Sequence, residues 1–175
     1  MLLDPYCRTF KGLRAVVEKQ WCCFGHKFDH RNGRGASKGS SLDEERSPIF
    51  GLFVDCVWTI MQQFPNEFQF NETLLLALLD QLMAGKTGTF LGNCKAEREQ
   101  YRESTMNVWD YLIDEYGVDE FLNKDWVGEK GAGDLQDGEG ELVVNCNPKN
   151  IRLWEDRWFR FDTSIVGYKT PKTYF

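Results

Sequence analysis

Residues 47–94 read SPIFGLFVDCVWTIMQQFPNEFQFNETLLLALLDQLMAGKTGTFLGNC, and this stretch decides the fold. Ser47 followed by Pro48 is typical of a helix start, because a hydroxyl side chain can cap the first turn and an amide hydrogen is not needed there. Pro65 should end this helix, since the residue before a proline is disfavoured in the helical region. Between these limits, apolar side chains recur at helical spacing and predict one wide buried face: Ile49, Phe53, Cys56, Val57, Ile60 and Phe64.

A second amphipathic helix is predicted from Asn71, a good N-cap residue, to Gly85, which should stop it. Its expected apolar face consists of Leu75, Leu78, Leu79 and Leu82. Phe68 and Phe70 should form a short extended elbow between the two helices. Such a helical hairpin has to bury its faces against other segments, so we expect a mainly α fold with little strand.

The flanking sequence adds further helical segments. The Asp4-Pro5 pair predicts the start of an earlier helix, with Phe10, Leu13, Val17 and Trp21 at helical spacing. Residues 31–47 are polar and rich in glycine, as expected of a surface loop. Residues 95–104 should be a solvated helix or turn, and residues 108–122 a short helix and its exit. We expect residues 1–122 to form one unit, followed at 123–175 by a glycine-rich acidic loop and an aromatic C-terminal arm that docks through residues 151–161.

Composition narrows the functional classes. The 175-residue chain is 42% hydrophobic and contains 13 phenylalanines, which favours a packed core. Its net charge of −6 argues against non-specific nucleic-acid binding, which needs a basic surface. No apolar run approaches the roughly 20 residues of a membrane-spanning helix. The N-terminal residues lack the features of a signal peptide and the six cysteines are irregularly spaced, so we expect reduced thiols in a cytoplasmic protein.

The most concentrated set of possible metal ligands is Cys22, Cys23, His26 and His30. Zinc accepts thiolates and imidazoles, but adjacent cysteines rarely serve one tetrahedral ion, and the usual site joins two separated ligand pairs. We therefore expect no metal here. Instead, His26 should be structural, held by hydrogen bonds in the turn from Phe24 to Phe28.

Other local patterns are also better explained by ordinary structure. Gly85-Lys86-Thr87 imitates the end of a phosphate-binding loop, but Asp80 stands where that motif needs a glycine, and the segment ends a helix instead of beginning one. Asn71-Glu72-Thr73 fits a glycosylation sequon and is better explained as a helix cap. The acids from Asp134 to Glu141 lack the spacing of a calcium loop. Cys94 and Cys7 are possible nucleophiles that lie in no phosphate-cradling loop.

Several segments together resemble the myotubularins, phosphatases of 3-phosphorylated inositol lipids. The resemblance is carried by Leu2-Leu3-Asp4-Pro5-Tyr6-Cys7-Arg8-Thr9, by Lys11-Gly12, Glu18-Lys19 and Trp21, and by Phe24-Gly25-His26-Lys27-Phe28. It continues through Ser47-Pro48-Ile49-Phe50, Cys56-Val57-Trp58, Gln63-Phe64-Pro65, Phe68, Phe70-Asn71-Glu72 and Gly88-Thr89-Phe90-Leu91-Gly92-Asn93-Cys94. It is weaker at Arg98-Glu99 and Trp109 and is expected to fade beyond about residue 122.

The resemblance implies that this chain is the helical C-terminal portion of a cysteine-phosphatase-like α/β domain. In that family the nucleophile lies in a loop of a cysteine, five residues and an arginine, and the resemblance places this loop before Met1. Cys94, followed six positions later by Gln100, does not fit the loop. We therefore expect no catalytic, cofactor-binding or metal-binding residue in this chain, and no cofactor.

Two functions stay open from sequence. The first is a fragment of a phosphatidylinositol 3-phosphate or 3,5-bisphosphate 3-phosphatase domain, for which the family implies a phosphoinositide lipid as substrate. The second is a non-catalytic, pseudophosphatase-like module that binds an active myotubularin-like partner. In either case we expect a cytoplasmic protein, at most peripheral on endosomal membranes. We also expect an isolated chain to be marginally stable, because the first helix would lack a strand to cover Phe10, Leu13, Val17 and Trp21.

Overall fold

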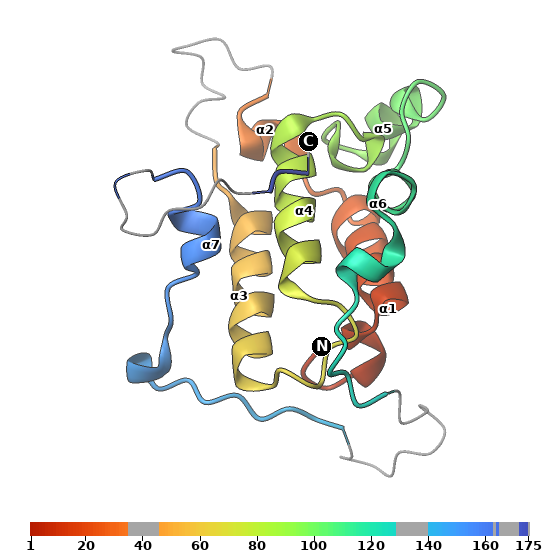
Figure 1. Ribbon diagram of the computed structural model, residues 1–175. Helices are drawn as coiled ribbons and strands as arrows, with labels where there is room; N and C mark the ends of the chain where they lie inside the picture. Colours follow the sequence, from red (N-terminus) through yellow and green to blue (C-terminus); the bar gives the residue numbers. More distant parts are fainter. Residues whose placement is uncertain (35–45, 129–139, 163, 165–171, 175) are drawn as a thin grey trace.

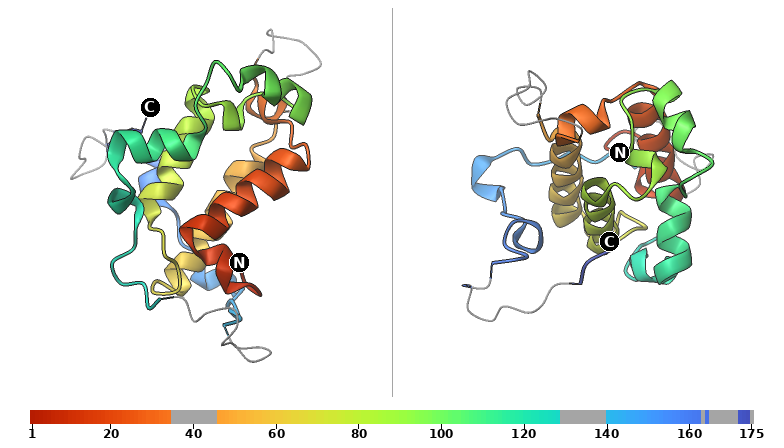
Figure 2. Two further views of the ribbon diagram at one scale, coloured as in Figure 1. Left: turned by 90° about the vertical axis from the view of Figure 1, so that its right-hand side faces the viewer. Right: turned by 90° about the horizontal axis from the view of Figure 1, so that it is seen from above.

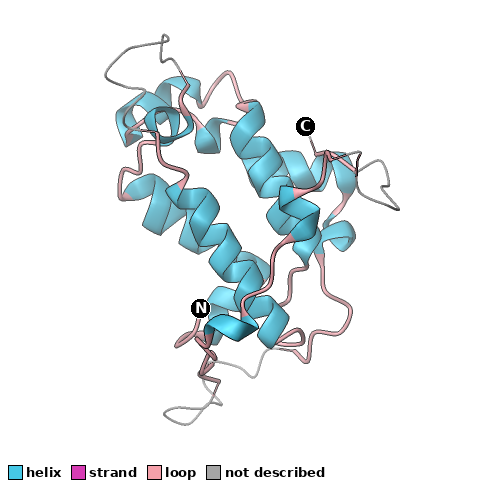
Figure 3. Ribbon diagram, turned by 90° about the vertical axis from the view of Figure 1, so that its left-hand side faces the viewer, coloured by secondary structure: helices cyan, strands magenta, loops and turns pink. Residues whose placement is uncertain are grey.

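A computed structural model describes residues 1–34, 46–128, 140–162, 164 and 172–174 (Figure 1). The described residues are helical segments and loops, with an isolated antiparallel bridge between Phe70 and Leu122 and no strand (Figure 3). The α-helices are α1 (Phe10–Ala15), α2 (Phe28–Asn32), α3 (Ile49–Gln63), α4 (Glu72–Ala84), α5 (Lys95–Tyr101), α6 (Val108–Tyr116) and α7 (Glu155–Trp158). The prediction of a mainly α fold is confirmed. Within these residues, no helix has both the length and the apolar character needed to cross a bilayer.

The hairpin of α3 and α4 lies at the centre of the fold, with the two helices running in opposite directions (Figure 1). The predicted end of α3 before Pro65 is confirmed. The Asn71 side chain caps α4 by accepting a hydrogen bond from the Leu74 N–H at 3.2 Å, as predicted. Gly85 ends α4 with a φ of 63°, a left-handed conformation that glycine adopts easily. The predicted start was wrong by one residue, because Pro48 occupies the cap position and no side chain caps α3.

The buried face of α3 differs from the prediction. Ile49 is 41% exposed and Cys56 is also exposed, although both were expected inside. The side chains actually buried are Phe50, Val54, Val57, Trp58 and Met61. Because α3 is apolar on most of its circumference, its own periodicity does not determine which side faces inward. The neighbouring side chains determine it. Phe50 makes ring-edge contacts with Trp21 and Phe28, and Trp58 is covered by Trp154 of the C-terminal arm.

The single N-terminal helix expected from sequence is divided into three pieces. A 3-10 helix η1 (Pro5–Arg8) is capped by Asp4, whose side chain accepts a hydrogen bond from the Tyr6 N–H at 2.9 Å. Thr9 then caps α1, which continues as a π-helix η2 (Val16–Cys23). The predicted loop at 31–47 begins later than expected, since Arg31 and Asn32 belong to α2. Residues 35–45 of that loop lie outside the described residues.

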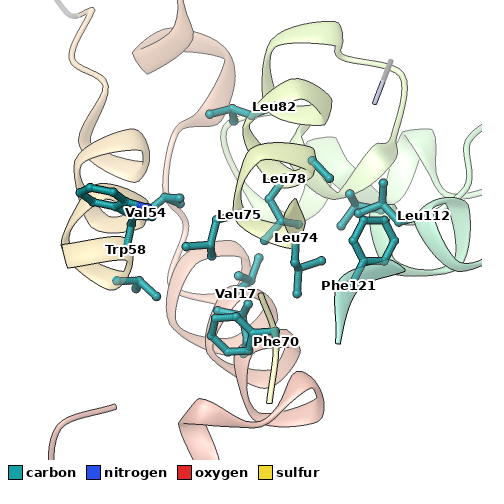
Figure 4. Close-up of a cluster of buried hydrophobic side chains, with 14 of the residues drawn as sticks. Val17, Val54, Trp58, Phe70, Leu74, Leu75, Leu78, Leu82, Leu112 and Phe121 are labelled. Carbon is teal, nitrogen blue, oxygen red and sulfur yellow. The ribbon is translucent and has the colours of Figure 1, made fainter. Parts of the chain in front are cut away.

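The expectation that the N-terminal helical face would be open was wrong. Leu13 and Val17 are 1% and 0% exposed, and Phe10 packs edge-on against Trp109 of α6 at 5.7 Å. Trp21 is half-buried against the aromatic rings of α3. Figure 4 shows how Val17 and leucines of α4 meet side chains of α3, α6 and the 3-10 helix η5 (Val118–Phe121) in one core. These helices therefore cover one another within this chain.

The C-terminal arm docks on the side of α3 that faces away from α1 (Figure 2). Trp154 is 2% exposed and stacks on Trp58, with ring centroids 5.3 Å apart and planes 7° apart. Arg160 forms a two-pronged ion pair with Asp80 of α4, at 2.8 and 3.0 Å. Of the aromatic side chains predicted to dock at 151–161, only Trp154 is buried, whereas Trp158, Phe159 and Phe161 are exposed. Within this segment only α7 is helical. Residues 129–139 of the expected glycine-rich loop lie outside the described residues.

Candidate functional site

The possible metal ligands between Cys22 and His30 point in different directions. The Cys22 thiol donates to the Thr89 carbonyl oxygen at 3.5 Å, and burial raises its pKa to about 11. The Cys23 side chain is exposed at the surface. Nowhere in the part of the chain that the structure describes do three or more histidine, cysteine, aspartate or glutamate side chains gather to hold a metal ion.

His26 lies in a hydrogen-bonded turn, as predicted, but hydrogen bonds do not hold its ring. Its backbone N–H donates to the Trp21 carbonyl oxygen at 2.9 Å, as a hydrogen-bonded turn requires. Its ring is instead fixed by edge contacts with Trp21 and Phe28, at 4.9 and 4.7 Å between centroids. The Nε2 atom is buried without a hydrogen-bond partner among the described residues. Burial, followed by the charges of Arg31 and Arg98, lowers the pKa of this imidazole, which favours its neutral form.

Hydrogen bonds connect the family-like segment at residues 22–30 to the one at residues 88–98. The sequence did not reveal the side chains that form these bonds. Arg98 donates to the carbonyl oxygens of Gly92 at 3.3 Å and His26 at 3.5 Å, and also to that of Cys22. The Asn93 side chain accepts the His30 N–H at 3.0 Å, and the Asp29 carboxylate accepts the Gly92 N–H at 2.8 Å. These contacts show that the paired signatures form a structural clamp, because each polar side chain here serves a backbone group.

The other sequence patterns also have structural explanations. Gly85-Lys86-Thr87 follows the end of α4, where the Gly85 N–H bonds back to Gln81, so no helix N-terminus is present to hold phosphate. The Asn71 amide nitrogen donates to the carbonyl oxygens of Glu120 and Leu122 at 2.9 and 3.1 Å, so this side chain is fully used. Of the acids from Asp134 to Glu141, only Glu141 lies within the described residues.

The cysteines suggested as nucleophiles lack the required surroundings. Cys7 is half-buried and donates its S–H to Asp4 at 3.4 Å, and burial raises its pKa, which favours the unreactive thiol. Cys94 is exposed and stands at the cap position of α5 without forming a side-chain cap bond. The Asp4 carboxylate beside Cys7 raises the pKa of that thiol further through its hydrogen bond and its charge, which again favours the unreactive form.

One cysteine does have the phosphatase spacing, a match that the reasoning from sequence overlooked: Cys146 is followed six positions later by Arg152. A phosphate cradle needs free backbone amides between these two residues. Pro148 has none, and the other four already donate within the segment: Asn147 to the Asn145 side chain (3.0 Å), Lys149 to the Asn147 side chain (3.0 Å), Asn150 to the Asn147 carbonyl (2.9 Å) and Ile151 to the Pro148 carbonyl (3.2 Å). The spacing is therefore coincidental, and this segment is not a catalytic loop.

Arg8 is a buried cation near the N-terminus, 3% exposed beside a cleft of about 320 Å³. Its guanidinium donates to the carbonyl oxygens of Met1 and Gly140, each at 2.8 Å, and pairs with Glu67 at 3.4 Å. Burial lowers the pKa of Arg8, and the Glu67 carboxylate opposes that shift. The remaining Nε atom is buried, so it cannot reach a ligand in the cleft. Arg8 thus joins three segments and is a structural residue.

The described residues thus form a helical unit in which the signatures around residues 22–30 and 88–98 are fastened to each other. The myotubularin-like phosphatase domain profile matches residues 1–99, and the chain belongs to that family. Rat myotubularin is 44% identical over 173 residues, covering 98% of this chain and 27% of the relative. Human phosphatidylinositol-3,5-bisphosphate 3-phosphatase MTMR8 is 40% identical over 169 residues, covering 94% of this chain and 22% of the relative.

Myotubularin of Xenopus laevis is 44% identical over 167 residues, covering 94% of this chain and 26% of the relative. The chain thus spans about a quarter of the length of these relatives. The alignments also extend well past residue 122, where the resemblance was expected to fade. The C-terminal arm is therefore shared with the relatives along with the helical hairpin.

Proposed function

We propose that this chain is the helical supporting part of a myotubularin-type phosphoinositide 3-phosphatase and that the catalytic cysteine loop is not encoded in its 175 residues. The observation that carries this proposal is that polar side chains in the family-like segments bind the backbone of this chain: Arg8, Asn93 and Arg98 all bind carbonyl oxygens or amides. A phosphatase centre needs a thiolate in a cradle of free amides, and the described cysteines lack one.

In the complete domain, a thiolate from the catalytic loop attacks the 3-phosphate of the lipid. The bond between phosphorus and the inositol oxygen breaks, and that oxygen takes up a proton. Water then hydrolyses the phosphocysteine and releases inorganic phosphate. The substrates proposed are phosphatidylinositol 3-phosphate and its 3,5-bisphosphate, in keeping with the names of the relatives. We also propose that the protein is cytoplasmic and that the complete domain binds peripherally to endosomal membranes that contain these lipids.

The test is phosphate release from phosphatidylinositol 3-phosphate in vesicles. We expect no turnover by the 175-residue chain and turnover by a family protein that contains the cysteine loop, assayed side by side. Turnover by the chain that disappears in Cys94→Ser, Cys7→Ser or Cys146→Ser would refute the supporting role.

A second candidate function is a non-catalytic module that binds an active myotubularin-like partner. It is favoured by apolar side chains that remain exposed on α3, α4 and the arm: Leu52 (61%), Met83 (68%), Trp158 (57%) and Phe161 (62%). Co-purification with an active family member would support this function if it is lost in Leu52→Asp or Met83→Asp. It should be retained in Val143→Asp, a change at a residue that is 88% exposed elsewhere in the chain. Retention in all three variants would contradict it.

A further inference from the structure

A polar cleft of about 380 Å³ lies between the C-terminal half of α3 and the segment that leads into α7, drawn in light blue in Figure 1. None of the roles assigned above uses it. The lining residues come from two parts of the chain: Trp58, Thr59, Gln62 and Gln63 from α3, and Asn145, Lys149, Asn150 and Arg152 from the segment opposite.

The two walls of this cleft are fixed to each other at both ends. At one end, the Gln63 side chain accepts the Asn145 N–H at 2.8 Å and donates to the Asn145 carbonyl oxygen at 3.4 Å. At the other end, Trp154 stacks on Trp58 and donates its indole N–H to Glu72 at 2.5 Å. The cleft is therefore a built part of the fold.

The charge inside the cleft is entirely positive. Lys149 and Arg152 are the only ionisable residues in its lining, and neither forms an ion pair with a described residue. This absence of acids contrasts with a chain whose net charge is −6. The carbonyl groups at the end of α3 contribute only about half a negative charge, which two full positive charges outweigh.

Neutral donors add to the two cations. The side chains of Gln62 and Asn150 are exposed and have no hydrogen-bond partner among the described residues. A phosphate monoester offers three strong acceptor oxygens, which suit a guanidinium, an ammonium and an amide donor. We propose that this cleft binds the phosphate monoester group of a small anionic ligand.

The phosphate could belong to a soluble molecule or to a lipid headgroup, so the test has two arms. Calorimetry measures the binding of myo-inositol hexakisphosphate to the whole 175-residue chain, with uncharged myo-inositol as the comparison. Flotation measures binding to vesicles that contain phosphatidylinositol 4-phosphate. The test variant is Lys149→Gln with Arg152→Gln, and the matched control is Lys95→Gln with Lys124→Gln, which removes the same charge from exposed positions outside the cleft.

We expect affinity for at least one probe, weakened about tenfold or more in the test variant and within about twofold in the control variant. Circular dichroism should show the same unfolding midpoint in both, since all four side chains are exposed. Cys146→Ser should bind as the unchanged chain does, because the thiol is not part of the cleft. Binding to the soluble probe or to vesicles alone identifies the source of the phosphate. Equal weakening by both variants, or no binding to either probe, would overturn the proposal independently of phosphatase activity.

Discussion

Replacement of Trp154 by alanine tests whether the C-terminal arm is part of the folded body. Trp154 is 2% exposed, stacks on Trp58 and donates to Glu72. The substitution removes all three features: the buried area, the ring contact and the hydrogen bond. It also uncovers Trp58 on α3, which is now 7% exposed.

The expected loss of unfolding free energy is about 3–5 kcal/mol, the usual range for replacing a buried tryptophan by alanine. The matched control is Trp158→Ala on the same short helix. Trp158 is 57% exposed, and its described ring contact is with the Arg157 guanidinium, 4.5 Å from the ring centroid. An exposed cation–π contact of this kind contributes about 0.5–1 kcal/mol.

Both free energies are measured by urea unfolding followed by far-ultraviolet circular dichroism, which does not depend on the tryptophan that has been removed. The difference between the variants should be at least about 2 kcal/mol. Losses that agree within about 0.5 kcal/mol would mean that the arm contributes nothing specific to the fold, and the docking contacts described above would then be refuted.

Three further outcomes follow from buried or perturbed groups. Asp80→Asn should destabilise the chain by about 3–5 kcal/mol in urea unfolding, because it leaves the 7% exposed Arg160 side chain without its carboxylate partner. At about pH 8, iodoacetamide should label Cys23 and leave Cys22 unlabelled by peptide mass spectrometry, because burial raises the Cys22 pKa to about 11. Burial lowers the pKa of His26 from 6.5, so His26 binds a proton less readily in the folded chain than in the unfolded chain. The free energy of unfolding should therefore fall as pH drops below about 6.5, and His26→Gln should make this fall less steep.

The predictions for Asp80 and Cys22 have clear contradicting results. A loss in Asp80→Asn no larger than that in Glu99→Gln, which breaks an exposed pair with Arg102, would show that the buried ion pair is unimportant. Equal labelling rates would show that Cys22 is not shielded. The raised Cys22 pKa also requires stability to decline as pH rises from 9.0 to about 11, and a flat profile there in the chain with Cys22, compared with Cys22→Ala, would refute the shift.

The end of α3 and both ends of α4 were predictable because their causes are local. Asn71 caps α4 through an amide three residues away, and Gly85 and Pro65 act through their own backbone geometry. The buried face of α3 was not predictable in the same way. Its orientation depends on Trp21 and on Trp154, which lies nearly a hundred residues further along the chain.

The structural roles of Arg8 and Asp80 were missed for the same physical reason. The spacing of apolar residues around each of them would equally allow an exposed charge there. Their partners Gly140 and Arg160 lie 132 and 80 positions away. Gly12 did carry a signal, because a glycine inside a helix usually has a packing reason. In the structure a side chain there would overlap the Tyr6 carbonyl oxygen.

The separation between Arg8 and its partner has a consequence for synthesis on the ribosome. The α3–α4 hairpin can close as soon as residue 84 has emerged, because its helices are joined by a short connection and loop closure is inexpensive at that length. Arg8 can bind the Gly140 carbonyl oxygen only after 132 further residues have been synthesised. During that interval of several seconds, at the usual rate of about 5–20 residues per second, the guanidinium has neither this acceptor nor the segment that covers it. The nascent chain therefore presents a hydrated cation where the finished protein has a buried one.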